Sequence, residues 1–362
     1  MARVLCAMSG GVDSSVAAAL LVEQGHEVIG VTMNTWGEVH PDFILNEHSG
    51  CCSLSAVEDA RAVANKLGIP YYVFNFQGHF SDTVVEYFLD EYSQGRTPNP
   101  CIACNRHVKF AAFLDRARQL ECEFIATGHY ATVGEDPAFP GRRLLGESAD
   151  PGKDQTYVLY NLTQDALAHT LFPVGHLHKS ETRRIAAQLG LHVVAEKPDS
   201  QEICFVLDQD YARFVTERRP EAAQPGPLLS TRGEVLGEHR GLPYYTIGQR
   251  RGLGLAAGRP LYVVDIDPER NAVIVGDDPE VLHSELVAED CNWIALPALA
   301  APRACTAKIR STARAAACRI APLPGGRVQV QFDAPVRAPA PGQAVVFYDG
   351  LWVLGGGTII RT

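Results

Sequence analysis

The chain has 362 residues and a mass of 39.3 kDa; 46% of its residues are hydrophobic, 20% are charged, and its formal net charge is −10. This length exceeds what one hydrophobic core usually organises, so two or three domains are expected, and the composition excludes a generally disordered chain. No apolar run reaches the roughly 18–20 residues of a membrane-spanning helix, and Arg3 enters a strand without a charged-then-apolar leader. We therefore expect a cytoplasmic protein with no membrane partner.

The first 130 residues alternate the signals of strands and helices. Strands are predicted at 4–8, 28–33, 71–76 and 124–127, and helices at 15–24, from Ser55 to Gly68, at 81–94 and from about 106 to 120. Repeated strand–helix units predict a parallel sheet with helices on both faces, and ligands bind such sheets beyond the carboxyl ends of the strands. The loop at residues 9–14 falls at that edge.

After about residue 210 the pattern changes to short strands separated by turns. Proline-rich stretches indicate a linker or turn at 220–227 and a second break at 297–302, and strands are predicted at 261–266, 272–276 and 327–332. Asp349-Gly350 joins two apolar runs as a hairpin turn would. The predicted fold class is α/β, with a parallel-sheet domain at 1–208, a small β-rich central domain at 209–284 and a C-terminal β-barrel at 285–362.

The charge is unevenly distributed along the chain. Residues 291–362 contain eight Lys or Arg and two Asp, a net charge of +6, so the remainder carries −16. Such asymmetry indicates an anionic partner for the basic segment. A basic but merely solvated surface is the alternative.

Ser9-Gly10-Gly11-Val12-Asp13-Ser14 lies between a predicted strand and a predicted helix. A glycine-rich turn in this place directs backbone N–H groups at a phosphate and adds the positive end of the helix. The loop has neither the Gly-Lys-Ser/Thr of a Walker A motif nor the G-x-G-x-x-G fingerprint, and a tight turn that needs two glycines is the alternative. It resembles the SGGxDS loop of the PP-loop ATP pyrophosphatases, which cleave ATP between the α- and β-phosphates and adenylate a substrate.

Ten cysteines are too few for a disulfide scaffold, and they stand at positions 6, 51, 52, 101, 104, 122, 204, 291, 305 and 318. Cys104 is predicted at the start of a helix, where the dipole, Arg106 and Lys109 favour its thiolate. Cys101 and Cys104 form half of a zinc motif that no second half completes, so no metal site is predicted from the protein alone, and a thioredoxin-like dithiol is a further alternative. Cys204, taken alone, is typical of a core cysteine.

Together these motifs resemble one family, the tRNA-specific 2-thiouridylases. The resemblance is carried, in the family's order, by residues 8–14, 97–105, 126–130, 153–155, 199–205, 245–255, 308–310, 341–343 and 347–350. One departure follows Lys308-Ile-Arg310, where the family commonly has an aromatic–basic pair and this chain has Ser311-Thr312. The resemblance covers nearly the whole chain and implies a PP-loop domain of the adenine nucleotide alpha hydrolase type at its N-terminal end.

The resemblance implies ATP-dependent 2-thiolation of the wobble uridine of tRNA, with Mg²⁺ and with sulfur delivered as a persulfide by a sulfur-relay or cysteine desulfurase protein. Cys204 would carry the persulfide, and Cys104 would be the nucleophile that closes a transient disulfide with it. ATP would be bound by Ala7, Met8, Ser9, Gly10, Gly11, Val12, Asp13, Ser14, Met33 and Gly128. The target base would contact Asn99, Pro100 and Cys101, and the rest of the tRNA would contact His129, Lys153, Asp154, Gln155, Arg310, Ser311 and Gln343.

Two other functions are compatible with parts of the sequence. A PP-loop ligase could adenylate a small metabolite, but such a ligase needs no sulfur relay, so Cys104 and Cys204 distinguish it from a thiolase. A non-catalytic RNA-binding or zinc-stabilised adaptor is the third possibility, and AMP release that depends on tRNA would exclude it.

Overall fold

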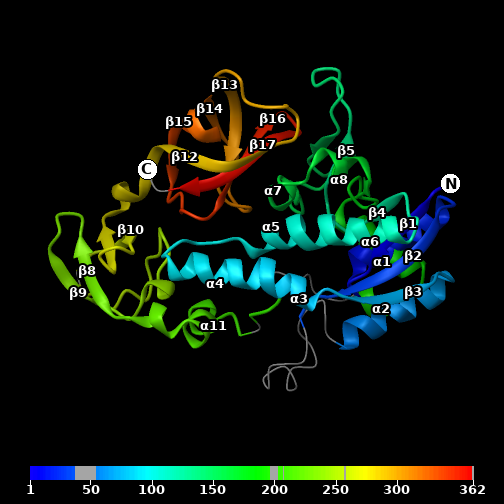
Figure 1. The fold of residues 1–362 in the computed structure, drawn as a ribbon, viewed down its shortest axis with the longest axis horizontal. Coiled ribbons are helices and arrows are strands. Elements are labelled where there is room, and N and C mark those ends of the chain that lie inside the picture. Colours follow the sequence, from blue (N-terminus) through cyan, green and yellow to red (C-terminus); the bar gives the residue numbers. More distant parts are fainter. Residues whose placement is uncertain (37–53, 196–202, 207, 257, 361–362) are drawn as a thin grey trace.

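The computed structural model describes residues 1–36, 54–195, 203–206, 208–256 and 258–360. Its strands form three sheets (Figure 1). A parallel sheet stands at one end of the long axis, a small central sheet stands at the other, and a C-terminal barrel lies above the helices that run between them (Figure 1). The three-part architecture predicted from the sequence is therefore confirmed.

The first sheet has five strands, all parallel, in the order β3-β2-β1-β4-β7. Four of them match predicted strands, and the two-residue β7 was not predicted. Their bounds are β1 Arg3–Ala7, β2 Glu27–Asn34, β3 Tyr71–Asn75, β4 Phe124–Ala126 and β7 Thr170–Leu171. Strand order reverses at β1, which lies between β2 and β4, and ligands bind parallel sheets at such a switch point.

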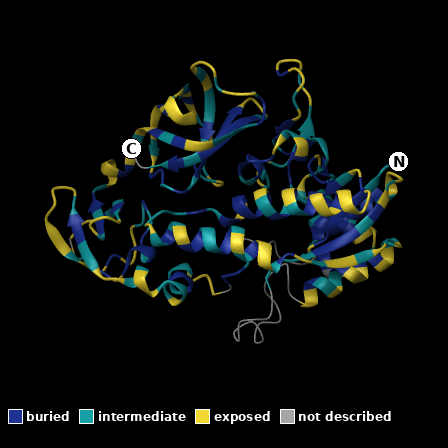
Figure 2. Cartoon of the chain, in the orientation of Figure 1, coloured by how far each residue is buried: buried dark blue, intermediate teal, exposed yellow. Residues whose placement is uncertain are grey.

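Helices cover both faces of this sheet, because successive strand side chains point to opposite sides. Val4 and Cys6 of β1 pack into one hydrophobic cluster, and Leu5 and Ala7 pack into another. The first cluster is completed by α1 Val12–Glu23, α2 Leu54–Leu67 and α9 Lys179–Gln188. The second is completed by two helices that are each interrupted by a π-turn. One consists of α3 Gln77–Phe80, the π-turn Ser81–Val85 and α4 Glu86–Ser93. The other consists of α5 Pro100–Cys104, the π-turn Asn105–Ala112 and α6 Phe113–Gln119. Strand β1 is largely buried and the edge strand β3 has exposed residues, and Figure 2 shows exposed residues on the outer faces of α2 and α6.

The central sheet has the order β10-β11-β8-β9. Its strands are β8 Gly226–Ser230, β9 Val235–His239, β10 Tyr262–Asp267 and β11 Ala272–Gly276, and the predicted hairpin of β10 with β11 is antiparallel. The turn predicted within 220–227 is present: Pro220–Ala223 forms a 3₁₀ turn, and β8 begins at Gly226. Proline suits the first position of such a short helix.

The C-terminal barrel has six antiparallel strands and is closed by pairing of β12 with β17. The strands are β12 Leu282–Trp293, β13 Arg303–Lys308, β14 Ala316–Pro322, β15 Val328–Arg337, β16 Ala344–Asp349 and β17 Trp352–Ile360. The predicted hairpin turn between β16 and β17 is confirmed, with Gly350 at a φ of +58°.

A hairpin from the N-terminal domain extends the barrel sheet. Strands β5 Thr132–Gly134 and β6 Leu144–Gly146 pair with each other, and Trp352 of β17 lies in register with Gly146. The Trp352 indole N–H donates a hydrogen bond of 2.9 Å to Asp136, and a Cβ on Gly134 would lie 2.8 Å from the Trp352 ring. The barrel is thus tied to the first domain by backbone pairing as well as by side chains, which no sequence pattern indicated.

The remaining helices of the described ranges are short connections. They are α7 Thr156–Leu159, α8 Gln164–Ala168, α10 His192–Ala195 and α11 Tyr211–Arg218, with 3₁₀ turns at Leu242–Tyr244, Asp278–Val281 and Pro324–Gly326. Across the described ranges, no helix combines the length and the apolar character that a membrane span requires.

Candidate active site

The predicted phosphate loop connects β1 to α1 and closes on itself through hydrogen bonds. The backbone N–H of Ser9 donates to the Ser14 hydroxyl over 3.1 Å, and that hydroxyl donates to the Gly11 carbonyl over 3.2 Å. Gly11 is the N-cap of α1 and offers no side-chain hydrogen bond to the first turn. The first N–H groups of a helix have no intrahelical partners, so this loop and helix end provide donors suited to a phosphate.

Two glycines let backbone segments approach at this edge. Gly10 has a φ of +70°, and a Cβ there would lie 2.3 Å from the Ala56 carbonyl oxygen. A Cβ on Gly128, just beyond β4, would lie 2.5 Å from the Ser14 nitrogen. The loops after β1 and β4 are therefore packed backbone to backbone, and the structure brings together two segments that the sequence predicted for nucleotide binding.

Neighbouring strands hold the start of the loop. The Met8 N–H donates to the Val31 carbonyl over 2.8 Å, and the Thr32 hydroxyl donates to the Met8 carbonyl over 2.6 Å. Ala7, Met8 and Val12 are buried. Met33 is half-buried near the end of β2 and packs against the hydrophobic cluster on the opposite face of the sheet from α1.

Asp13 in the first turn of α1 belongs to a polar network that was not predicted from the sequence. The Lys179 ammonium lies 2.7 Å from both Asp13 carboxylate oxygens, and the Tyr130 hydroxyl donates to the same carboxylate over 2.9 Å. Only 11% of the Lys179 side chain is exposed. A lysine at the first position of a helix interacts unfavourably with the helix dipole. This position in the sequence therefore indicates that Lys179 interacts with a group outside α9.

The helix that carries Cys104 begins earlier than predicted. Asn99 is its N-cap and accepts a hydrogen bond of 3.4 Å from the Ile102 N–H, and Pro100 is its first residue. Cys104 therefore lies in the second turn, and the prediction that it stands at the helix start was wrong. Because dipole effects fall off within the first turn, the dipole does not supply the expected thiolate stabilisation at Cys104.

Cys101, not Cys104, occupies the first turn. The Cys101 side chain is exposed at the surface, yet surrounding atoms restrict hydration of its thiol and raise its pKa, while Lys109 opposes that shift. Cys104 is buried, with 8% of its surface exposed. The two thiols of this motif thus differ in access, and the buried one is at the predicted nucleophile position.

Cys204 packs against the same hydrophobic cluster that contains Cys104. It is half-buried, and its neighbour Phe205 is inserted among aromatic rings, with centroids 5.3 Å from Phe88 and 5.4 Å from Phe214. The helix α5 that carries Cys104 packs on the π-turn Ser81–Val85, which lies between α3 and α4. Cys104 and Cys204, one hundred residues apart in sequence, therefore both contact one hydrophobic cluster. Cys51, Cys52 and residues 199–202 of the Cys204 motif lie outside the described residues.

Several residues predicted to contact tRNA form bonds within the protein. The Gln343 amide donates to the carbonyls of Thr97 and Pro98 over 3.0 and 3.3 Å, so the barrel holds the loop that leads to Asn99. The Asp154 side chain is 6% exposed and accepts from the Ser148 N–H over 3.0 Å. The Gln155 side-chain oxygen accepts from the Tyr130 N–H over 2.8 Å. Pro100 is buried and Lys153 is half-buried.

The other predicted RNA contacts differ in their surroundings. His129 packs against the rings of Phe110 and Phe172 and shares a hydrogen bond of 2.7 Å with the Thr127 hydroxyl. Burial, assisted by Lys109, holds the pKa of His129 well below its usual range, so its imidazole is neutral. Arg310 donates to the Ala338 carbonyl, and burial lowers its pKa. Ser311 is exposed.

Comparison with known proteins identifies the family. Residues 2–208 match the tRNA methyl transferase HUP domain, residues 212–277 the tRNA methyl transferase PRC-barrel domain and residues 283–359 the aminomethyltransferase beta-barrel domain. The tRNA-specific 2-thiouridylase MnmA of Symbiobacterium thermophilum is 70% identical over 360 residues, which are 99% of this chain and 92% of that protein. The chain belongs to the tRNA-specific 2-thiouridylase family. A relative with the same name from Acetivibrio thermocellus is 55% identical over 357 residues, 99% of each chain.

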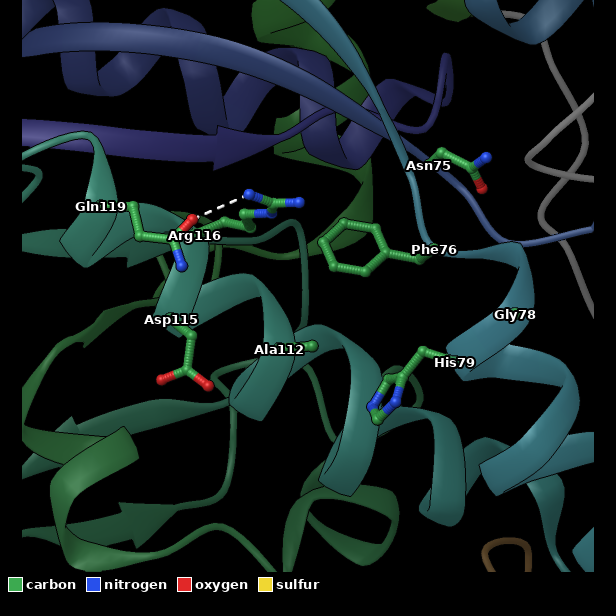
Figure 3. Close-up of a pocket in the computed structure, with 8 residues that line it drawn as sticks. All are labelled: Asn75, Phe76, Gly78, His79, Ala112, Asp115, Arg116 and Gln119. Carbon is green, nitrogen blue, oxygen red and sulfur yellow. Dashed lines mark hydrogen bonds between the residues drawn. The ribbon is translucent and has the colours of Figure 1, made fainter.

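Membership of the 2-thiouridylase family confirms the prediction of an enzyme of the tRNA-uridine 2-sulfurtransferase class. A cavity of about 430 Å³ lies between α3 and α6 (Figure 3). Phe76, His79, Asp115 and Arg116 line it, and Arg116 bonds to Gln119 over 2.8 Å. It contains none of the predicted site residues, so its volume does not identify the reaction centre.

Proposed function

We propose that the chain catalyses ATP-dependent 2-thiolation of the wobble uridine of tRNA. The observation that carries this proposal is the pairing of a phosphate loop at the switch point of the sheet with two cysteines that pack against one hydrophobic cluster. The loop supplies a means to activate an oxygen, and the cysteines supply a means to deliver sulfur. Family membership supports the same reaction.

In the first step, the C2 oxygen of the uridine attacks the α-phosphorus of ATP, an adenylated base forms and pyrophosphate leaves. The N–H groups of residues 9–14 and the N-terminus of α1 would bind the phosphates and stabilise the charge that develops on the leaving group. Met33 and Gly128 would flank the nucleoside. Adenylation turns a poor leaving oxygen into AMP.

Mg²⁺ fits the donor chemistry of this loop, because Mg²⁺ is usually bound by one or two carboxylates together with substrate phosphates. Asp13 would hold it, and the ion would neutralise charge on the pyrophosphate. In the structure the Asp13 carboxylate is oriented by Lys179 and Tyr130. Both carboxylate oxygens lie 2.7 Å from the Lys179 ammonium, so Mg²⁺ would share this carboxylate with Lys179.

In the second step, sulfur replaces AMP at C2. A donor protein would load Cys204 as a persulfide; the Cys104 thiolate would attack the Cys204 sulfur and form a Cys104–Cys204 disulfide. The terminal sulfur, released with the electron pair of the broken S–S bond, would add at C2 and expel AMP. Reduction of the disulfide by a thiol would restore both cysteines for the next cycle.

We assign these roles to three units, with residues 1–208 for catalysis, 209–284 as the central domain and 285–362 as a tRNA-contacting barrel. Asn99, Pro100 and Cys101 would contact the target base, which an anticodon loop can expose by unstacking. Lys153 and Ser311 would contact the RNA directly. Since the side chains of Asp154, Gln155 and Gln343 already bond within the protein, we expect them to position loops for the RNA.

The experiment that tests this function separates adenylation from sulfur transfer. Purified protein is incubated with unmodified tRNA, ATP and a persulfide donor, and the anticodon loop is analysed by mass spectrometry while AMP is quantified. Wild type should add one sulfur at the wobble uridine, and Cys204→Ser should abolish that gain while AMP still forms. Cys291→Ser, a half-buried cysteine of β12, is the matched control. Undiminished thiolation by Cys204→Ser would refute the sulfur relay.

A further inference from the structure

The central domain presents two adjacent arginines on a loop without a role in the proposed reaction. Residues 246–255, here called the arginine loop, connect the 3₁₀ turn Leu242–Tyr244 towards β10. Arg250 and Arg251 are exposed, and neither forms an ion pair with a described carboxylate. The chain has 42 acidic residues and 32 basic ones, so carboxylates are plentiful, and two adjacent arginines without such a partner indicate an anionic ligand from outside the chain.

The arginine loop is held in one conformation. The Gly248 N–H donates to the Val263 carbonyl over 2.8 Å, and the Val263 N–H donates to the Gln249 carbonyl over 2.9 Å. The Gln249 side chain accepts from the Thr246 N–H over 3.0 Å and donates to the Arg251 carbonyl over 2.9 Å. A ligand would therefore meet a preorganised loop and would lose little affinity to ordering it.

Glycines shape the surface beside the arginines. Gly252 and Gly254 have φ values of +77° and +70°, and Leu253 between them is buried and anchors the loop. Arg250, these three residues and Pro260 line a cavity of about 360 Å³. Exposed backbone without side chains, next to guanidinium groups, suits close approach by a phosphate.

The arginine loop adjoins a segment of the barrel already assigned to the tRNA. A Cβ on Gly248 would lie 2.7 Å from the Ala338 Cβ and 3.8 Å from an Arg310 guanidinium nitrogen. Arg310 donates to the Ala338 carbonyl, so it is fixed at the junction between the barrel and the central domain. The two exposed arginines and Arg310 thus belong to neighbouring segments of two domains, and a polyanion that reaches Arg310 can continue onto the arginine loop.

We propose that the arginine loop is a second tRNA-binding surface, at which Arg250 and Arg251 pair with backbone phosphates of the same tRNA whose uridine is modified. This inference rests on the proposed function, because it takes the tRNA as the polyanion. Contacts to phosphates position an RNA without reading its sequence. The arginine loop should therefore contribute affinity to every tRNA substrate equally.

The test measures binding of an unmodified tRNA transcript to the full chain over a series of salt concentrations. Arg250→Gln with Arg251→Gln should weaken binding about tenfold near physiological salt and reduce the slope of log affinity against log salt by roughly two, about 0.9 for each phosphate contact. The matched control is Arg232→Gln with Arg270→Gln, two exposed arginines of the same domain. Arg250→Lys with Arg251→Lys keeps both charges and should restore the wild-type slope.

The outcomes separate this inference from the proposed function. If the glutamine variant of the arginine loop binds tRNA with the same affinity and the same salt slope as its control, the inference is overturned. The proposed function would still stand in that case, because the wild type binds tRNA. Failure of the wild type to bind tRNA would overturn both. A slope that stays low in the lysine variant would show that the loss comes from a distorted loop and would also overturn the phosphate contact.

Discussion

The phosphate loop and the cysteine site are built in different ways. The phosphate loop consists of consecutive residues, 9–14, whose backbone would bind the phosphates in the proposed reaction, and its shape depends on Gly10 and Gly128. The cysteine site consists of two side chains from distant segments, and a shared hydrophobic cluster sets their placement. A site built from backbone should lose binding when atoms are added to it. A site built from side chains should lose activity when the packing around it is removed.

The largest expected effect follows from adding atoms at the phosphate loop. In Gly128→Val the new Cβ would lie 2.5 Å from the Ser14 nitrogen, so the first turn of α1 must shift. Since overpacking costs about 1–3 kcal/mol and a 1 Å displacement can cost about a hundredfold in function, ATP affinity should fall at least about a hundredfold. Calorimetric titration with a non-hydrolysable ATP analogue measures this.

Gly78→Ala is the control, because a Cβ at Gly78 would meet open space. It should bind the analogue as wild type does. Wild-type affinity in Gly128→Val would mean that the nucleotide does not lie between the loops after β1 and β4.

The next effect follows from removing packing at the cysteine site. Phe205→Ala empties the aromatic cluster beside Cys204 and should destabilise the fold by about 3–5 kcal/mol. Because Cys204 would lose its fixed position, the sulfur transferred per AMP formed should fall roughly tenfold to a hundredfold. Tandem measurement of AMP and thiolated tRNA below the melting temperature gives this ratio.

Phe139→Ala removes a ring that is also buried, from the barrel cluster, and serves for comparison. It should lower the melting temperature without changing the ratio of sulfur to AMP. If both variants change that ratio alike, general destabilisation accounts for the loss and Phe205 has no part in placing Cys204.

The smallest effect concerns pH. The folded protein keeps His129 neutral because its pKa is lowered, whereas the unfolded chain binds a proton below its ordinary pKa of about 6.5. The unfolded state therefore binds more protons, and stability should fall as the pH drops below about 6.5, by at most about 1.4 kcal/mol per pH unit from this group. Melting temperatures at pH 7.5 and 5.5 should differ less in His129→Gln than in wild type, and the exposed His176→Gln should match wild type.

The parallel sheet and the phosphate loop could be predicted because their signals are local. Alternation of Val4, Leu5 and Cys6 into opposite clusters follows from strand geometry, and a glycine pair between a strand and a helix indicates its own turn. The bond of Lys179 to Asp13 spans 166 residues, and no periodicity encodes it.

Other predictions were wrong because one sequence signal is compatible with two local structures. Pro100 precedes the helix predicted from about residue 106, although proline suits the first position of a helix, and α5 therefore begins before the predicted start at Cys104. The shared cluster around Cys104 and Cys204 arises from tertiary packing of segments joined only in the folded state. Family resemblance suggested that these thiols work together, and residue patterns alone did not.

The hairpin β5–β6 has a consequence for the evolution and engineering of the molecule. Trp352 pairs with Gly146, so strand pairing crosses the line that a sequence-based division would draw between the first and last domains. Excising the C-terminal segment would leave β6 with an unpaired edge and the Gly134 surface without its indole cover, and bare edges promote aggregation. The first domain and the barrel should therefore be expressed and exchanged together.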